Sequence, residues 1–329
     1  MRSLPHWHRP LPLLATSVAA AAVFLSALAV MALIAGWSRV MHQLHQGLSF
    51  WLAIAFAAEL IAFCAYILAY RAVAAVDHGP RLSLREATEF VAVGFGAFLA
   101  KGGAALDSKA LRRSASEREG EVRVMALDAL EHAPLAPAAC AAAIILLAHG
   151  SRKPGLDFTI PWATLVPVGA ALAWLGVRHR ERFVGHDGAR GKLGDILEAI
   201  HVLFRLIAEW REHWLGFVGA TLYWAGDVLC LWAALQPFNA APSFPAIVLA
   251  HAVGYVLTRR TLPLAGAGIV EVLMPLTLVA GGAPFAGAIL GVFVYRLFNL
   301  WLPLLPAAVA LPRLRRRFGP SFRPLLHES

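Results

Sequence analysis

The sequence has few charged residues. Only 15% of its 329 residues are Asp, Glu, Lys or Arg, whereas 59% are hydrophobic. A soluble globular domain has about a quarter charged residues and about 45–50% apolar ones. The composition therefore excludes a water-soluble protein and an intrinsically disordered one, and it indicates an all-α polytopic membrane protein. At about 20 apolar residues per crossing, the chain has room for about eight spans and for no sizeable soluble domain.

Sequence features of several chemistries are also missing. Three cysteines, Cys64, Cys140 and Cys230, lie inside apolar runs without the C-x-x-C spacing of a metal or redox site, so we expect buried free thiols. The chain has no G-x-x-x-x-G-K-[ST] motif for ATP, no H-E-x-x-H zinc motif and no G-x-S-x-G nucleophile motif. From these absences we expect no catalytic residues, no metal ligands and no cofactor.

The charge that is present is mostly positive. Lys and Arg number 29 against 20 Asp and Glu, which gives a formal net charge of +9. In a soluble protein this excess would indicate nucleic acid binding. Here the basic residues lie between the apolar runs, as in the cytoplasmic loops of membrane proteins, so we expect no nucleic acid partner. The Arg-rich segments are 71–85, 101–123, 178–192 and 313–323, whereas 236–243 and 281–284 carry no charge. This distribution predicts that both termini are cytoplasmic.

Long apolar runs predict the membrane spans. The eight expected crossings are 13–37, 50–70, 130–148, 159–175, 215–235, 246–257, 262–279 and 285–311. A shorter run, 87–105, is interrupted by glycines. If this run crossed the membrane, two Arg-rich segments would lie on opposite sides. We therefore predict that it enters from the cytoplasm and returns as a broken or re-entrant helix.

A second Gly-rich segment resembles the first. Residues 92–107 read AVGFGAFLAKGGAALD, and residues 252–271 read AVGYVLTRRTLPLAGAGIVE. Interrupted hydrophobic segments at matching positions in two halves indicate an inverted repeat with a binding site near the bilayer midplane. Unwound backbone is tolerated at that depth only beside a cavity or buried in protein. Two other interpretations stay open: the glycines serve close helix packing, or Arg259 and Arg260 form a plain turn between two full spans.

Together these features predict a single transmembrane domain over residues 1–329. Its expected parts are a first half over 1–150 with a broken helix over 87–105, a cytoplasmic linker and interfacial helix over 178–211, a second half over 212–312 with a broken helix over 252–271, and a basic cytoplasmic tail over 313–329. Between Leu193 and Trp210 apolar residues recur every three or four positions, which predicts an amphipathic helix lying in the membrane interface. A helix packed across the underside of the bundle is the alternative.

Ionisable residues within the spans are candidate site residues, because a charge at the bilayer centre costs about 2.5–3.5 kcal/mol on insertion scales. Arg296 lies deepest in an apolar run, and its expected partner is Glu271. A planar guanidinium suits an anionic lipid head group better than an ammonium does. The alternative is a structural ion pair that locks two helices. Asp227 and Glu59 are interpreted as internal hydrogen-bonding residues, and His251 as an interface residue.

Motifs in the final third and near residue 105 resemble those of a known family. The closing motifs are LPLAGAGIVE at 262–271, Tyr295-Arg296, and WLPLLP at 301–306. An earlier element, KGGAALD at 101–107, departs from the usual form because Lys101 replaces a common Pro. On these motifs the chain resembles the lysylphosphatidylglycerol synthase transmembrane family. This is the flippase-like membrane domain of bacterial aminoacyl-lipid synthases and of stand-alone relatives, some of them hopanoid-associated.

The resemblance implies a translocator of lipids or lipid-linked substrates in the bacterial inner membrane. We expect a membrane lipid with an anionic or zwitterionic head group as the substrate, and no aminoacyl transfer, because the soluble transferase domain is absent from the chain. A second copy of the chain and lipid-synthesis enzymes are the candidate protein partners. The predicted substrate-binding residues are Lys101, Gly102, Gly103, Asp107, Arg260, Gly266, Gly268, Glu271, Tyr295 and Arg296. Two other function classes stay open, an intramembrane lipid-modifying enzyme and an accessory subunit of a lipid-synthesis complex.

Overall fold

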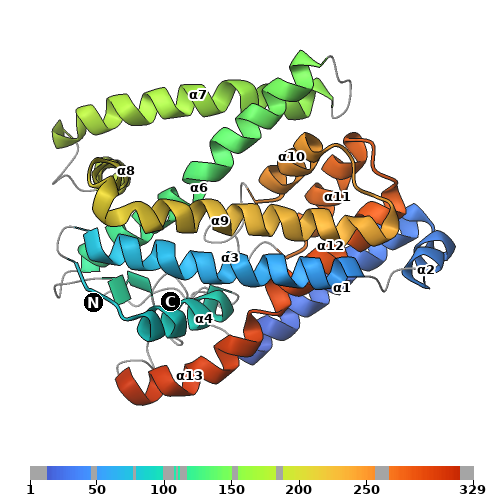
Figure 1. Ribbon diagram of the computed structural model, residues 1–329, viewed down its shortest axis with the longest axis horizontal. Coiled ribbons are helices and arrows are strands. Elements are labelled where there is room, and N and C mark those ends of the chain that lie inside the picture. The colour runs from blue at the N-terminus through green and yellow to red at the C-terminus, as the bar shows by residue number, and fades with distance from the viewer. Residues whose placement is uncertain are drawn as a thin grey trace.

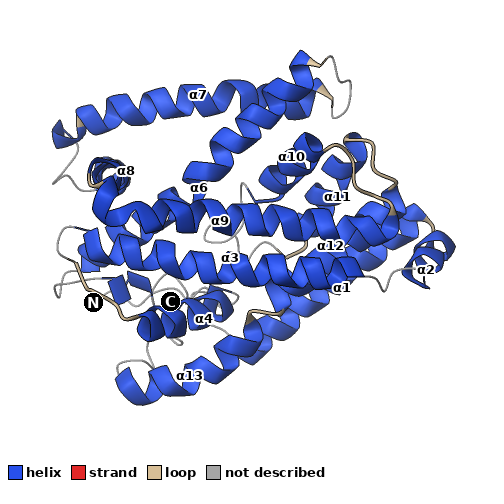
Figure 2. Cartoon of the chain, viewed as in Figure 1, coloured by secondary structure: helices blue, strands red, loops and turns tan. Residues whose placement is uncertain are grey.

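A computed structural model describes most of the chain, namely residues 13–45, 50–76, 79–98, 107–108, 110–111, 117–149, 155–182, 188–255 and 267–318. Within these ranges every regular element is a helix and none is a strand (Figure 2). Helices satisfy their own backbone hydrogen bonds, which is what a chain this apolar needs in lipid. The predicted all-α class is confirmed.

Five stretches are long and apolar enough to cross a membrane. They lie in α3 (Phe50–Ala75), α6 (Glu117–Ala148), α7 (Leu156–Arg178) and α9 (Trp210–Leu235), and in Phe285–Leu314, which joins α12 (Phe285–Arg296), a π-helical segment (Leu297–Trp301) and part of α13 (Leu304–Phe318). Three shorter apolar helices accompany them, in α1 (Leu13–Ala35), α10 (Phe244–Tyr255) and α11 (Val270–Ala280). The fold is a polytopic helix bundle, and the number of eight crossings stays a prediction.

The two longest central helices, α3 and α9, lie side by side through the middle of the bundle (Figure 1). Helices α6 and α7 flank them on one side, and α1, α12 and α13 on the other. The remaining helices are α2 (Trp37–His45), α4 (Leu84–Phe98) and α8 (Gly188–Ala208). Because α3 belongs to the predicted first half and α9 to the second, their contact joins the two halves.

Small residues let α3 and α9 approach closely. A Cβ atom added at Gly219 would lie 2.6 Å from the Ala65 carbonyl oxygen, and one at Gly226 would lie 2.7 Å from the Ala58 carbonyl oxygen. Such contacts between backbones are the usual means of helix association in lipid, where no hydrophobic effect drives helices together. Close packing therefore requires glycine at these positions. The same contacts fix the position of α9 along the axis of α3.

The described part of α10 and helix α11 are each shorter than the hydrocarbon core of a bilayer. They have 12 and 11 residues, or about 17–18 Å at 1.5 Å per residue, against a hydrocarbon core of about 30 Å. They pack against each other; α10 begins just after the uncharged segment 236–243 and α11 ends just before 281–284. Both helices therefore reach from the uncharged end of the bundle into its interior. The tip of the predicted broken helix, 256–266, lies outside the described residues, as do residues 99–106 of the first one.

Helix α8 contains the predicted amphipathic stripe, with one difference at its end. Leu197 and Leu206 are buried against the bundle, whereas Leu193 and Ile207 are exposed. The stripe ends at Ala208, because Trp210 begins α9 after a break at Glu209. An apolar face that is only half covered is compatible with a helix in the interface, which stays a prediction.

Two further details differ from the sequence interpretation. Helix α6 begins at Glu117, well before the predicted start at 130, because its first turns are polar and hydropathy marks only the apolar part. Cys64 is exposed on the outer surface of α3, whereas Cys140 and Cys230 are buried. In a lipid-facing position exposure and an apolar run are compatible, so the expectation of a buried thiol was wrong for Cys64.

Candidate functional site

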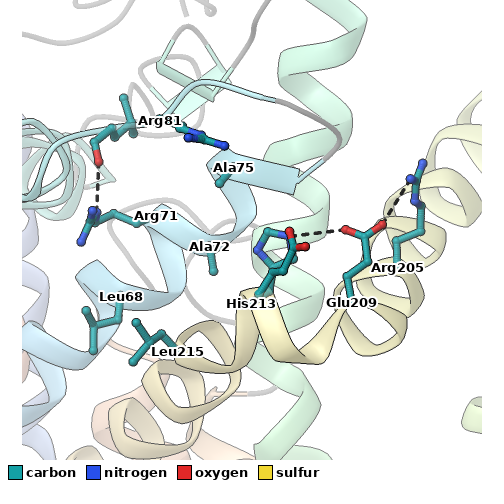
Figure 3. A pocket seen from close by; sticks show the side chains of 11 residues that line it. Leu68, Arg71, Ala72, Ala75, Arg81, Arg205, Glu209, His213 and Leu215 are labelled. Carbon is teal, nitrogen blue, oxygen red and sulfur yellow. Dashed lines mark hydrogen bonds and ion pairs between the residues drawn. The ribbon is translucent and has the colours of Figure 1, made fainter.

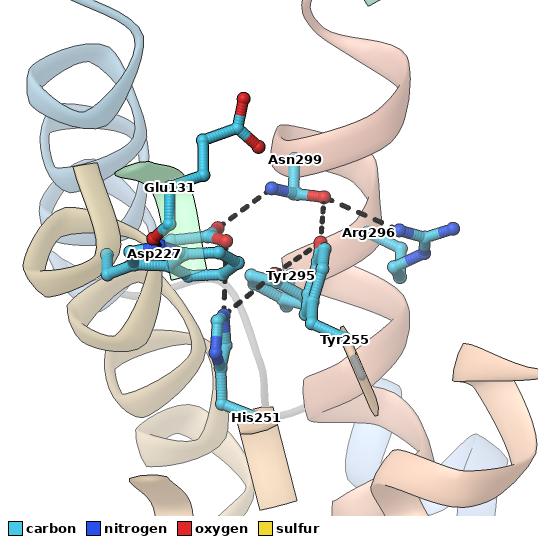
Figure 4. Close-up of polar contacts among 8 residues, drawn as sticks. Glu131, Asp227, His251, Tyr255, Tyr295, Arg296 and Asn299 are labelled. Atoms are coloured by element: carbon cyan, nitrogen blue, oxygen red, sulfur yellow. Dashed lines mark hydrogen bonds and ion pairs between the residues drawn. The ribbon is translucent and has the colours of Figure 1, made fainter. Parts of the chain in front are cut away.

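Buried polar side chains from five elements meet inside the bundle, and Figure 4 shows most of them. They are Asp227 on α9, His251 and Tyr255 on α10, Glu271 on α11, Tyr295 and Arg296 on α12, and Asn299 on the π-helical segment. We call this set the buried network. Each member is less than 5% exposed. Polar groups so far from water must satisfy one another, so their arrangement is tightly specified.

An ion pair between Arg296 and Glu271 forms one end of the buried network. Arg296 Nε donates to Glu271 Oε1 at 2.6 Å, and the two side chains are 2% and 0% exposed. The expected contact between these residues is therefore present. The second oxygen of Glu271 accepts a hydrogen bond from the Gly268 backbone N–H, which needs a positive φ of 90° at Gly268. Local sequence explains this geometry, since Glu271 occupies the first turn of α11 and Arg296 the last turn of α12, where the helix dipoles favour these charges.

A closed ring of hydrogen bonds forms the other end of the buried network. His251 Nε2 lies 3.1 Å from Asp227 Oδ2 and 3.3 Å from the Tyr295 hydroxyl. The Tyr295 hydroxyl donates to the Tyr255 hydroxyl at 2.7 Å, and Tyr255 donates to Asn299 Oδ1. Asn299 Nδ2 closes the ring by donating to Asp227 Oδ1 at 2.8 Å. The five residues thus form one continuous hydrogen-bonded circuit.

Asn299 connects the ring to the ion pair. Its side-chain oxygen also accepts a hydrogen bond from Arg296 Nη1 at 3.4 Å. The remaining guanidinium nitrogen, Arg296 Nη2, is buried and has no hydrogen-bond partner in the described part of the chain. An unpaired buried donor costs about 1–3 kcal/mol, and more when the group is charged. Arg296 therefore has an unused donor directed into the protein interior.

Aromatic and acidic residues of α6 and α9 surround the ring. The ring centroids of Trp224 and His251 lie 5.2 Å apart, edge to face, and His251 stacks on Tyr255 at 4.7 Å. Trp224 Nε1 donates to the main-chain oxygen of Glu131, and the Glu131 carboxylate accepts from the Tyr66 hydroxyl. Helix α6 thereby brings a third buried carboxylate, that of Glu131, beside the two of the network.

The first Gly-rich segment lies at a separate place. Asp107 is buried and accepts a hydrogen bond from the Tyr70 hydroxyl on α3 at 3.0 Å. Gly94 of α4 lies beside it, since an added Cβ would be 3.6 Å from Asp107 Oδ1. A row of aromatic rings on α3 and α9, with neighbouring centroids 4.9–6.5 Å apart, connects this place with the buried network: Tyr70, Tyr66, Tyr223 and Trp224.

Five of the ten predicted site residues belong to the described part of the chain. The structure brings Gly268, Glu271, Tyr295 and Arg296 together in one hydrogen-bonded assembly, and it places Asp107 apart from them. The other five, Lys101, Gly102, Gly103, Arg260 and Gly266, lie outside the described residues.

Several members of the buried network were not singled out from the sequence. His251 was interpreted as an interface residue, but it is fully buried, and its ring contacts the Asp227 carboxylate. The interpretation of Asp227 as an internal hydrogen-bonding residue is confirmed. The available signals for the others were weak: Asn299 follows Arg296 by three positions, and Tyr255 is the aromatic residue of the repeated Ala-Val-Gly-aromatic motif.

A pocket of about 600 Å³ opens at the Arg-rich end of the bundle (Figure 3). Arg71 and Arg81 lie on one side of it and Glu209 and His213 on the other, and Glu212 also lines it. Arg71 Nε donates to the Leu82 carbonyl oxygen at 3.0 Å. Glu209 pairs with Arg205 at 3.4 Å and with His213 at 3.5 Å. We call this place the charged pocket.

Comparison with known proteins identifies the family. No curated protein matches the sequence. The family model described as the lysylphosphatidylglycerol synthase TM region matches residues 17–307, which covers four of the five long apolar helices, most of the fifth and the whole buried network. The chain is therefore a multi-pass membrane protein that belongs to the lysylphosphatidylglycerol synthase TM region family.

Proposed function

We propose that the protein translocates lipids with phosphate-bearing head groups, anionic or zwitterionic, across the bacterial inner membrane. A lipid crosses a bilayer slowly because its polar head must leave water, and a protein lowers that barrier by offering polar partners inside the membrane. The observation that carries the proposal is the unused donor of Arg296 in the middle of the longest apolar stretch of the C-terminal region.

The geometry around Arg296 supports an anionic ligand. Glu271 and Asn299 hold the guanidinium through Nε and Nη1, so the side chain is oriented while Nη2 stays available. A phosphate oxygen is the acceptor that a guanidinium donor suits best. The N-terminus of α11 begins beside Glu271 and adds a positive dipole end. The π-helical segment that follows Arg296 is of a kind found frequently at functional sites.

The described conformation is closed over this site, since Arg296 is only 1% exposed. A head group reaches it only if neighbouring elements move. The short helices α10 and α11 are the elements that pack against the network from the uncharged end, and discontinuous helices of this kind line substrate sites in transporters. We propose that their displacement against α12 opens the site.

A second candidate function, an intramembrane lipid-modifying enzyme, is favoured by one observation. His251 faces the Asp227 carboxylate at 3.1 Å, and a histidine oriented by a carboxylate is a common general base. The hydrogen-bond partners described for His251 are Asp227 and Tyr295, so no serine or cysteine nucleophile contacts it in the described part of the chain. Mass spectrometry of lipids after incubation separates the two functions, because a translocator leaves them chemically unchanged.

A reconstitution assay tests the proposal. Purified protein is placed in phosphatidylcholine vesicles with a trace of acyl-labelled fluorescent phosphatidylglycerol, and dithionite quenching reports movement between leaflets. We expect rapid movement for the natural protein and none for Arg296→Ala. The matched control is Arg85→Ala, because the Arg85 side chain is 81% exposed and only pairs with Glu89 on the surface. Wild-type rates in a folded Arg296→Ala variant would refute the assignment.

The orientation of the bundle is part of the same proposal. We propose that the end with the charged pocket faces the cytoplasm, together with both termini, because Arg-rich segments favour that side. Single cysteines at Arg81 and Asn239, in a background without the natural cysteines, test it in intact cells. A membrane-impermeant maleimide is expected to label only the variant at Asn239, and the reverse labelling would refute this orientation.

A further inference from the structure

We propose that His251 Nδ1 is a proton-binding site, and that proton uptake there is coupled to head-group binding at Arg296. The protein would then be a proton-coupled lipid transporter. This inference rests on the proposed function, because it names the ion that accompanies the lipid. The inference rests on the directions of the hydrogen bonds in the ring. Among the described residues, these directions leave the lone pair of one buried basic nitrogen, His251 Nδ1, without a hydrogen-bond donor facing it.

The hydrogen-bond directions can be followed around the ring from Asp227. An ionised carboxylate only accepts, so Asn299 presents its NH₂ group to Asp227 and its oxygen to Tyr255 and Arg296. Tyr255 must then donate to Asn299, and its own oxygen accepts from the Tyr295 hydroxyl. The Tyr295 proton is used, so only its lone pair faces His251 Nε2.

This order decides which nitrogen of His251 carries the proton. Nε2 faces two acceptors, the Tyr295 oxygen and Asp227 Oδ2, so it must be the protonated nitrogen of the neutral ring. Nδ1 is then a bare lone pair, and it is buried with no hydrogen-bond partner among the residues that the structure describes. The reverse arrangement, a protonated Asp227 and an Nδ1–H, would leave a buried donor unpaired. The vacant lone pair at Nδ1 is therefore the place where an added proton binds.

An added proton at Nδ1 finds compensating charge on several helices. It makes His251 an imidazolium that keeps its Nε2–H bond to the Asp227 carboxylate, a charge-assisted contact. The ionisable and charged groups around the ring are Asp227 and Cys230 on α9, Glu59 on α3, Glu131 on α6, Tyr255 on α10, Glu271 on α11, and Tyr295 and Arg296 on α12. Four of them are carboxylic acids and one is a guanidinium, so a second positive charge is favoured.

The coupling to Arg296 passes through Asn299. The same side-chain oxygen accepts from Arg296 and from Tyr255, and its NH₂ group donates to Asp227. An anionic head group at Arg296 neutralises the guanidinium and leaves the acids of the interior without a countercharge. Uptake of one proton from water at His251 restores the balance, and release of the lipid returns the proton; the N–H bond at Nδ1 is the only bond formed and broken. By linkage, a proton at His251 equally strengthens anion binding.

The experiment uses the vesicles described above with a pH gradient imposed across them. For phosphatidylglycerol, one negative charge moving with one proton is electroneutral. We expect the labelled lipid to become asymmetric between leaflets by about tenfold per pH unit of gradient, since one pH unit for one proton corresponds to a tenfold ratio. A valinomycin–potassium potential without a pH gradient should produce no asymmetry, and a protonophore should abolish the asymmetry caused by the pH gradient.

Variants assign the effect to His251. His251→Gln and Asp227→Asn are expected to lose the response to the gradient, whatever rate of lipid movement they retain. His132→Gln is the matched control, because this histidine is half-buried on α6 and its Nδ1 contacts the Asp128 carbonyl oxygen, outside the ring.

The outcomes separate this inference from the proposed function. Lipid movement by the natural protein that ignores the pH gradient overturns proton coupling and leaves translocation intact. A complete lack of lipid movement overturns both. If His251→Gln fails to fold, the gradient and protonophore measurements on the natural protein still decide coupling, and Asp227→Asn decides the site. A gradient response that survives in folded His251→Gln overturns the assignment to His251.

Discussion

The buried network and the charged pocket are built from the same residue types in different surroundings. Each contains an arginine, a carboxylate and a histidine: Arg296, Glu271 and His251 in the interior, and Arg205, Glu209 and His213 at the Arg-rich end. In the interior the ion pair is 2.6 Å long and almost fully buried. In the pocket the contacts of Glu209 are 3.4 Å and 3.5 Å long, and its side chain is 40% exposed.

The difference shows that burial, and not residue identity, fixes the chemical role. Water around Glu209 competes for its hydrogen bonds and screens its charge, so the pocket can exchange partners at little cost. No water replaces a lost partner in the buried network, so each proton and each donor there has one favoured position. A single unpaired donor or lone pair in the buried network therefore indicates a place for a ligand or a proton. In the charged pocket it would indicate little, because water can be its partner there.

The largest expected effect on the free energy of unfolding comes from replacing the carboxylate of each region. Glu271→Gln removes one partner of a buried ion pair and should lower the free energy of unfolding by about 3–5 kcal/mol. Glu209→Gln is the matched control at an exposed pair and should cost about 0–1 kcal/mol. Unfolding in mixed detergent micelles measures both. Equal effects of the two substitutions would contradict the distinction between the regions.

The second prediction concerns a substitution that should displace the buried network without changing a polar side chain. Gly226→Leu should force α9 away from α3, because even a Cβ would lie 2.7 Å from the Ala58 carbonyl oxygen, and it should destabilise the fold by about 1–3 kcal/mol. Asp227 is the next residue, so lipid movement should fall as well. Gly169→Leu on α7 is the control, since nothing lies within 4 Å of an added Cβ there. A stable Gly226→Leu variant with full transport would show that neither folding nor lipid movement depends on the close contact between α9 and α3.

A third prediction opens the hydrogen-bonded ring at one atom. Tyr255→Phe removes the hydroxyl that accepts from Tyr295 and donates to Asn299, and the unsatisfied partners should cost about 1–3 kcal/mol. Thermal unfolding in detergent measures the effect. The control is Thr164→Val on α7, where an exposed hydroxyl only bonds its own helix at the Ile160 carbonyl oxygen. A neutral Tyr255→Phe would mean that the ring is not closed in solution.

The smallest expected effect concerns salt. Arg205→Ala should lower stability by about 0.2–1 kcal/mol in dilute buffer, and by less at high ionic strength, where exposed charges are screened. The stability contributed by the Arg296–Glu271 pair should change little with salt, because ions do not reach it. Repeating the unfolding measurements at low and high salt tests both expectations. A strong salt effect at Glu271 would place that pair in contact with water.

Much of the site near Arg296 could be predicted from the sequence because it is local. Glu271 and Arg296 are the only Asp, Glu, Lys or Arg residues in their apolar runs, and each occupies the helix end whose dipole favours its charge. Two such residues in neighbouring hydrophobic segments have few other partners available. Asp107, which the repeated Gly-rich pattern groups with them, accepts a hydrogen bond from Tyr70 on α3, and its part in the site stays a prediction.

His251 and Asn299 could not be assigned in the same way. Their roles depend on Asp227, which lies 24 positions before His251 and 72 before Asn299. The interpretation of His251 as an interface residue came from its position near the start of an apolar run. Hydropathy does not show which helices pack around a residue, and it is this packing that buries His251 beside Asp227.

Composition and motif together determined the class of this protein. An apolar chain in lipid must satisfy its own backbone, which leaves a helix bundle, and the motifs around Glu271 and Arg296 indicated the family. The tertiary structure decided which polar groups share the interior, which nitrogen of His251 is bare and which donor of Arg296 is unused. The physical reason is that hydrogen bonds are short and directional, so they depend on how α9, α10 and α12 pack and not on the order of their residues.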